Sequence, residues 1–176
     1  KRLTNVTLTL VDGVAVGFYD SPAALTLHNG ARVISRGTAT RLNRIAPYFA
    51  VQEQPTIWGT ARPGALFELG ETFATVAPEI ELRFTGIDLF QAGSSSQQGL
   101  LITLSNLRRL CFVDCLIRGG YLNIVPHYDN DEQDQLIAFT NNVVEWTQIG
   151  LHQGYLGDFT RVDLHFRNNL FRTNTV

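Results

Sequence analysis

Four segments in the second half of the chain share one pattern of apolar and polar positions. Each begins with an apolar residue, a variable residue, a phenylalanine and a second variable residue, which is the alternation expected of a strand with one buried face. The phenylalanines are Phe84, Phe112, Phe139 and Phe166, at intervals of 28, 27 and 27 residues. Such regular spacing predicts a repeating structural unit.

A residue pair suited to a sharp bend lies inside each of these segments. The pairs are Gly86-Ile87, Asp114-Cys115, Asn141-Asn142 and Asn168-Asn169. Asn, Asp and Gly tolerate the left-handed backbone region, so we expect the chain to bend there in every unit. Apolar residues resume after each bend, and a third strand candidate follows at 100–104, 121–125 and 148–151. The pattern therefore predicts a coil of about three strands.

The start of the chain carries a shorter repeat. Leu8 and Leu25 lie 17 residues apart and open two segments that contain Asp12-Gly13 and Asn29-Gly30. Between apolar runs, such pairs usually close a β-hairpin. In a repeating array the same pairs can turn a corner between two strands of one coil, so both interpretations stay open.

These segments resemble the right-handed parallel β-helix superfamily, the pectate-lyase-like solenoids. The residues that carry the resemblance are Leu8 to Phe18, Ala24 to Thr38, Ile57 to Gly59 and Leu82 to Leu89. The resemblance implies an all-β fold, a right-handed parallel β-helix of about six or seven coils, whose stacked strands lie roughly 4.8 Å apart. Equivalent side chains then form ladders along the axis. The expected inward ladder is Phe84, Phe112, Phe139 and Phe166, with Asn142 and Asn169 stacked at the following bend.

The repeats indicate a single domain that covers residues 1–176. We expect opening coils at 1–37, irregular coils at 38–81 and regular coils of 27–28 residues at 82–176. The sequence stops at Val176 before its last coil could close, and no amphipathic helix is evident at either end. The expectation is therefore a segment of a longer β-helix, or an end that something else covers.

Composition and charge exclude several classes of protein. The 176 residues are 44% hydrophobic and 17% charged, which indicates a folded chain instead of a disordered one. With 14 basic against 16 acidic residues, the formal charge is -2, so no basic field exists to attract nucleic acid. No apolar run approaches the roughly 18 residues that cross a bilayer. We therefore expect no nucleic-acid partner and no membrane span.

The loop at 127–135 concentrates acidic side chains. Its residues Asp129, Asp131 and Asp134 could supply oxygen ligands to calcium. Because the loop lacks the glycine and the closing glutamate of an EF-hand, a solvated acidic loop is the alternative. The spacing of Cys111 and Cys115 disfavours both a disulfide bridge and a zinc site. The histidines are scattered, and we expect them on the surface.

Aromatic residues near the predicted bends indicate a second kind of site. The flat rings of Tyr121, Trp146 and Tyr155, on a rigid polar face, could stack on sugar rings. The alternative is partial burial beneath the loops. The sequence contains no Ser/His/Asp nucleophile motif, no Gly-rich phosphate loop and no CxxC pair. No acid recurs on successive coils in the manner of a catalytic row.

Together with the resemblance, these observations favour a non-catalytic β-helical segment of a large secreted or cell-surface bacterial protein. Its role would be that of a rigid spacer, an adhesin or a glycan-contacting module, with a polysaccharide or cell-surface glycan as partner. The first alternative is a calcium-assisted polysaccharide lyase or another polysaccharide-active enzyme. A further alternative is a structural filament unit that self-associates through open coil ends.

Overall fold

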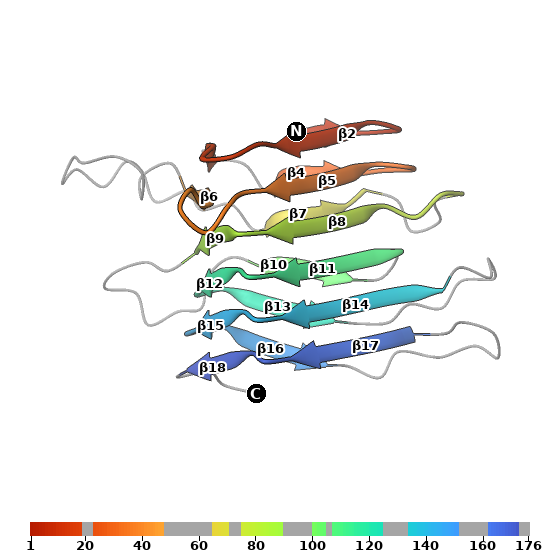
Figure 1. The fold of residues 1–176 in the computed structure, drawn as a ribbon. Helices are drawn as coiled ribbons and strands as arrows, with labels where there is room; N and C mark the ends of the chain where they lie inside the picture. Colours follow the sequence, from red (N-terminus) through yellow and green to blue (C-terminus); the bar gives the residue numbers. More distant parts are fainter. Residues whose placement is uncertain are drawn as a thin grey trace.

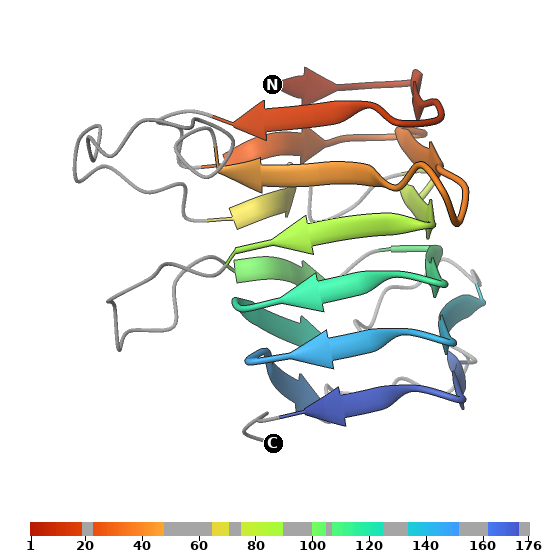
Figure 2. The ribbon, with the colours of Figure 1, turned by 60° about the vertical axis from the view of Figure 1, so that its left-hand side comes forward.

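The chain folds into three parallel β-sheets that run side by side along one axis. A computed structural model describes residues 1–18, 23–47, 65–70, 75–89, 100–104, 107–124, 134–151 and 162–172. Within these ranges the regular structure is entirely β, and each sheet contains six strands. Figures 1 and 2 show the strands stacked as successive coils, from the N-terminal strands at the top to the C-terminal strands at the bottom. The all-β parallel solenoid predicted from the sequence is therefore confirmed.

Each coil contributes one strand to each sheet. Sheet A contains β1 (Arg2–Leu3), β4 (Ala23–Leu27), β7 (Ala65–Leu69), β10 (Leu100–Leu104), β13 (Tyr121–Ile124) and β16 (Gln148–Leu151). Sheet B contains β2 (Thr7–Leu10), β5 (Arg32–Arg36), β8 (Glu79–Arg83), β11 (Arg109–Val113), β14 (Gln135–Thr140) and β17 (Val162–Arg167). Sheet C contains β3 (Ala15–Phe18), β6 (Asn43–Pro47), β9 (Thr85–Asp88), β12 (Leu116–Arg118), β15 (Val143–Glu145) and β18 (Leu170–Arg172). The prediction of three strands per coil is confirmed.

The interior of the solenoid is built from side chains that alternate along each strand. In sheet B, Leu110 lies opposite Ile137, and Phe112 lies opposite Phe139. All four side chains are buried, because every second residue of a strand points to the same face. The ring centroids of Phe112 and Phe139 are 4.9 Å apart, and those of Phe139 and Phe166 are 5.1 Å apart. Phenylalanines from three successive coils therefore form one continuous stack of rings, in which Phe112 meets Phe139 edge to face and Phe139 lies flat against Phe166.

Phe84 does not belong to this stack, and the predicted ladder is wrong there by two residues. Phe112 lies opposite Leu82, which is buried, while Phe84 follows the strand and adopts a left-handed backbone with φ 46°. Phe84 occupies the bend position that Asp114, Asn141 and Asn168 occupy in later coils. Gly86 therefore lies within β9 and not at the bend. A gapless alignment on the phenylalanines could not detect this offset.

The Asp-Gly and Asn-Gly pairs near the start of the chain turn corners and do not close hairpins. Asp12-Gly13 connects β2 to β3, and Asn29-Gly30 connects β4 to β5. The strand containing Leu8 pairs with β5, so Leu8 lies opposite Val33 and not opposite Leu25. The 17-residue spacing therefore relates two different corners of the coil and is not the coil repeat.

The last coil has its apolar side chains largely in contact with solvent. Leu164, Phe166, Leu170 and Phe171 are 49%, 40%, 58% and 45% exposed. The equivalent residues one coil earlier include Phe139 at 0% and Val144 at 1%. Burial of a coil thus requires neighbours on both sides, as expected of a solenoid.

Replacing Phe139 with alanine should lower the free energy of unfolding by about 3–5 kcal/mol, because it opens a cavity between the rings of Phe112 and Phe166. Urea denaturation followed by circular dichroism measures this loss. The control is Leu170→Ala, whose side chain is 58% exposed and should cost less than about 1 kcal/mol. Equal losses at both positions would contradict the stacked core.

Candidate functional site

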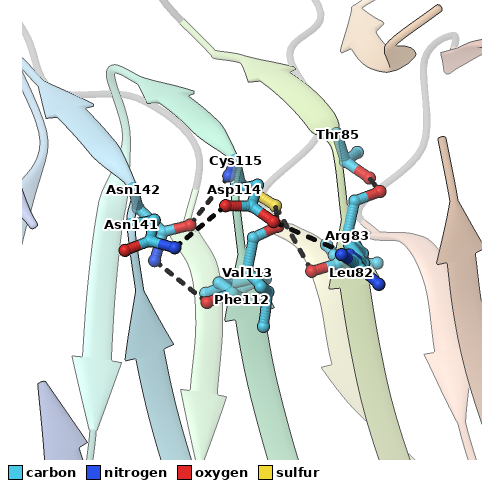
Figure 3. Close-up of polar contacts among 9 residues, drawn as sticks. All are labelled: Leu82, Arg83, Thr85, Phe112, Val113, Asp114, Cys115, Asn141 and Asn142. Carbon is cyan, nitrogen blue, oxygen red and sulfur yellow. Dashed lines mark hydrogen bonds and ion pairs between the residues drawn. The ribbon is translucent and has the colours of Figure 1, made fainter. Parts of the chain in front are cut away.

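A column of polar residues holds the corner between sheets B and C. Asn142 is buried, and its side-chain Oδ1 accepts the backbone N–H of Cys115 at 2.9 Å. Its Nδ2 donates to the backbone carbonyl of Phe112 at 3.0 Å and to Oδ1 of Asn169 at 3.0 Å. Figure 3 shows the first two of these contacts among the corner residues. The Asn142 side chain thus forms hydrogen bonds with backbone groups of the coil before it.

Asn43 and Asn169 repeat this arrangement at the same corner. Asn43 accepts from the backbone N–H of Val14 and donates to the carbonyl of Leu10, while Asn169 accepts from the backbone of Asn142 and donates to the carbonyl of Phe139. The two intervening coils use other residues, which are Thr85 and Cys115. Because the column satisfies buried backbone groups, it is a structural feature and leaves no group free for chemistry.

The two cysteines are free and buried. The thiol of Cys115 contacts the backbone carbonyls of Leu82 and Val113, both at 3.3 Å, and Figure 3 shows it inside the corner. Burial raises the pKa of this thiol from its ordinary value of 9.0 to about 11. Burial also raises the pKa of Cys111, against the opposing effect of a hydrogen bond from Arg109. Neither thiol has the lowered pKa of a reactive cysteine.

The outward face of sheet C carries a column of alternating charge. The charged column consists of Asp88, Arg118, Glu145 and Arg172, which lie opposite one another on β9, β12, β15 and β18. Nη1 of Arg118 is 3.5 Å from Oδ2 of Asp88, and Nε of Arg118 is 3.6 Å from Oε2 of Glu145. Nη1 of Arg172 is 3.5 Å from Oε1 of Glu145. The sequence contains the signal, since these residues follow one another at 30, 27 and 27 residues. It was missed because the column alternates acid and base instead of repeating one residue type.

These ion pairs are too open to act mainly as stabilising contacts. The side chain of Arg118 is 40% exposed and that of Arg172 is 71% exposed. Pairs of this kind contribute about 0–1 kcal/mol, because water screens the charges and the side chains lose rotamer freedom. The more exposed guanidinium groups can therefore exchange partners with the polar groups of a ligand at little cost, whereas the side chains of Asp88 and Glu145 are only 32% and 20% exposed.

Trp146 lies directly after the charged column, where the chain turns from sheet C towards sheet A. Its side chain is 52% exposed, and its backbone is left-handed with φ 55°. Gly119 occupies the equivalent position one coil earlier, with φ 73° and the same backbone hydrogen bond to the next coil. A bulky residue at a position that suits glycine costs strain, and strained residues concentrate at functional sites. The sequence marked Trp146 as an aromatic near a bend, and the structure places it beside the charged column.

Of the other residues predicted to bind glycan or calcium, the structure describes the side chain of Asp134 alone. Tyr121 is the first residue of β13, and its side chain is not described. Tyr155, Asp129 and Asp131 lie outside the described residues, so the calcium hypothesis stays a prediction. Asp134 is exposed immediately before β14. Across the described ranges, no three His, Cys, Asp or Glu residues are grouped closely enough to hold a metal ion.

The expectation of surface histidines is wrong for His28. This side chain is only 5% exposed at the corner between β4 and β5. It packs against Gly70, where an added Cβ would lie 2.3 Å from the imidazole ring. Gly70 therefore leaves the space into which His28 fits. His165 is exposed on β17, as expected from alternation.

Comparison with protein-family models, with curated proteins and with solved structures found no match for the chain. Among the described residues, no helix is long and apolar enough to cross a membrane. The structure thus defines a parallel β-solenoid whose candidate site is the charged column together with Trp146.

Replacing Asn142 with alanine should lower the free energy of unfolding by about 2 kcal/mol or more, because buried backbone groups of Cys115 and Phe112 lose their partners. Urea denaturation measures the change. The control is Asn141→Gly at the exposed neighbouring position, where φ is 56° and glycine fits, so the change should stay within about 0.5 kcal/mol. A corner without a structural role would respond equally weakly to both substitutions.

The raised pKa of Cys115 makes stability depend on pH in the alkaline range. The native state favours the neutral thiol, so this contribution is complete below pH 9 and is lost as the pH rises through about 11. Urea titrations at pH 8 to 11 should show a steeper loss for the natural chain than for Cys115→Thr, which cannot ionise and matches Thr85 in the preceding coil. Parallel pH profiles for the two proteins would contradict a buried thiol.

Proposed function

We propose that this chain is a non-catalytic β-helical segment of a secreted or cell-surface bacterial protein and that it contacts glycans through sheet C. The segment would belong with the right-handed, pectate-lyase-like β-helices that its sequence resembles. The observation that carries the proposal is Trp146, an exposed aromatic residue in a left-handed conformation at the edge of the charged column. A sugar ring could pack on the indole face.

The charged column supports the proposal because it places hydrogen-bonding groups beside the aromatic ring. Arg118 offers donors, and Glu145 offers acceptors that can bind sugar hydroxyls. Arg118, Glu145 and Trp146 come from two successive coils, and Glu145 directly precedes Trp146 in the sequence. Aromatic surface with a few placed polar groups is the usual composition of a small-molecule binding site.

The solenoid supports this use because it fixes the spacing of side chains along its axis. Strands of adjacent coils lie roughly 4.8 Å apart, so equivalent groups recur at that interval. A linear polymer that lies along the axis therefore meets a regular series of side chains. Arg118 and Glu145 lie on strands, which keep their geometry better than loops, and Trp146 directly follows one of these strands.

The alternative of a calcium-assisted polysaccharide lyase depends on the acidic loop around Asp129, Asp131 and Asp134. Catalysis of this kind would degrade the polysaccharide, whereas a binding module leaves it intact. Affinity electrophoresis through gels that contain a polysaccharide separates the two functions. Retardation of the protein measures binding, and clearing of the gel in the presence of calcium measures degradation.

Replacing Trp146 with glycine should abolish retardation in a neutral-polysaccharide gel and should not destabilise the chain. Glycine suits the left-handed backbone, as Gly119 demonstrates one coil earlier, so the substitution removes the ring without adding strain. Trp146→Phe is the matched control, because it keeps an aromatic face at the same position and should retain part of the retardation. Urea denaturation of all three proteins establishes that the fold is intact.

Unchanged retardation of Trp146→Gly would remove the aromatic residue from the proposed site. Clearing of the gel that requires calcium and disappears when Asp129, Asp131 and Asp134 are replaced would favour the lyase. Free migration of the natural chain in every gel would leave glycan contact unsupported.

A further inference from the structure

The two ends of the solenoid differ in how far their inner side chains are exposed. β2 and β17 are the edge strands of sheet B, and Figure 1 shows them at opposite ends of the stack. Phe166 on β17 is 40% exposed, whereas Leu10, in the same column on β2, is 8% exposed. Val6 and Val11 are exposed near β2, but they lie at the bends on either side of it. The exposed inner columns of sheet B therefore lie at the end that β17 forms.

The backbone of β17 can pair with another strand at its outer edge. The carbonyl of Arg167 accepts the N–H of Asn141 at 2.9 Å, so the backbone groups of Arg167 face β14. Successive residues of a strand direct these groups to alternate sides. Those of His165 therefore also face β14, and those of Leu164 and Phe166 face the outer edge, where no described strand lies. Such an edge can add a strand from another molecule.

The sequence of β17 is complementary to itself when two copies run antiparallel. Val162–Arg167 reads VDLHFR. When His165 lies opposite its own copy, Asp163 lies opposite Arg167 of the second copy. Leu164 then lies opposite Phe166 of the second copy. Opposite charges and pairs of apolar side chains attract in such cross-strand positions, and two-fold symmetry makes each pair occur twice.

This antiparallel register also suits the backbone of β17. In an antiparallel pair, opposite residues exchange both hydrogen bonds only where the backbone groups of both residues face the partner strand. Leu164 and Phe166 meet this condition, because their groups face the outer edge. His165 then forms the central pair without hydrogen bonds, where opposite side chains lie closest. Charge, apolar contact and backbone geometry therefore select the same register.

Head-to-tail stacking, with β2 of a second copy beside β17, lacks these features. Continuation of the columns would place Thr7 opposite Asp163 and Thr9 opposite His165, so no ion pair would form on this face. It would also join the exposed end to the end at which Leu10 is already buried. Contact between two β17 edges covers both exposed ends and leaves neither free to extend the assembly.

We propose that the chain forms a closed two-fold dimer in which β17 of one copy pairs antiparallel with β17 of the other. Asp163 and Arg167 form ion pairs on both sides of the central His165, and Leu164 and Phe166 fill the space between the two cores. The assembly ends at two copies, unlike the filament considered as an alternative from the sequence. This inference is independent of the proposed glycan contact, because it does not use Trp146 or Arg118.

The first test is sedimentation velocity of the chain over a range of protein concentrations. Asp163→Arg and Arg167→Asp should each raise the dimer dissociation constant at least about tenfold, because each places like charges opposite each other twice. The double variant restores opposite charges in exchanged positions and should dimerise within about threefold of the natural chain. Arg2→Asp is the matched control, because Arg2 is exposed on β1, the edge strand of sheet A at the other end. Urea denaturation establishes that every variant is folded.

The second test is a disulfide that only the two-fold arrangement permits. An antiparallel pair centred on position 165 brings the two Cα atoms within the range of a disulfide. Oxidation of His165→Cys with diamide should therefore give a covalent dimer on a non-reducing gel. Thr9→Cys, at an exposed position on β2, should stay monomeric under the same conditions. Both variants contain the buried Cys111 and Cys115, so the comparison controls for these thiols.

Each alternative gives a different result in these tests. A natural chain that stays monomeric at every concentration would overturn the dimer. Assemblies that grow beyond two copies, or a disulfide between Thr9→Cys and His165→Cys chains in a mixture, would show head-to-tail stacking and overturn the closed dimer. A folded double variant that does not dimerise would overturn the register. Equal weakening by Arg2→Asp and Arg167→Asp would show a general effect of charge and overturn the assigned ion pairs.

Discussion

The parallel hydrogen bonding of each coil to the coils on either side is the interaction on which the rest of the structure depends. A strand in this array has partners only above and below, so its backbone groups are satisfied only when successive coils keep one register. That register places equivalent residues in columns, as with Phe112, Phe139 and Phe166. All residues of one column therefore share a single environment, and each of them must pack well against the residues directly above and below it.

The corners obey a second constraint, because the backbone must turn while its polar groups stay satisfied. Residues with positive φ supply the turn, and the side chains of Asn43, Asn142 and Asn169 supply the missing hydrogen bonds. Thr85 and Cys115 occupy the same column with other contacts, so the corner tolerates different residue types. Two positive-φ positions carry bulky residues instead, Phe84 and Trp146. They lie at opposite ends of the strands of sheet C, Phe84 just before β9 and Trp146 just after β15.

The outward columns are free of the packing requirement and carry the charges. On sheet C the charges alternate from coil to coil, and neighbouring coils therefore attract each other. At the end of β8 the rule is broken, because Arg83 lies opposite Arg36. The inner columns explain the stability of the solenoid, whereas these outer columns differ from coil to coil and can determine what it binds. A fold of this kind supports many functions, so function must be argued from such exceptions.

The sequence by itself determined the strand alternation, the length of the repeat and the residues able to bend the chain. These are local properties, which follow from side-chain periodicity and backbone preference, and they were enough to predict a parallel solenoid of three strands per coil. The tertiary structure alone decided the register between coils. It placed Phe84 at a bend instead of in the core, and it buried His28. It paired Leu8 with Val33 instead of Leu25, and it aligned four charged residues in one column, which are Asp88, Arg118, Glu145 and Arg172. Register is a property of pairing between distant segments, and a shift of two residues leaves the alternation of each strand unchanged while it changes every neighbour.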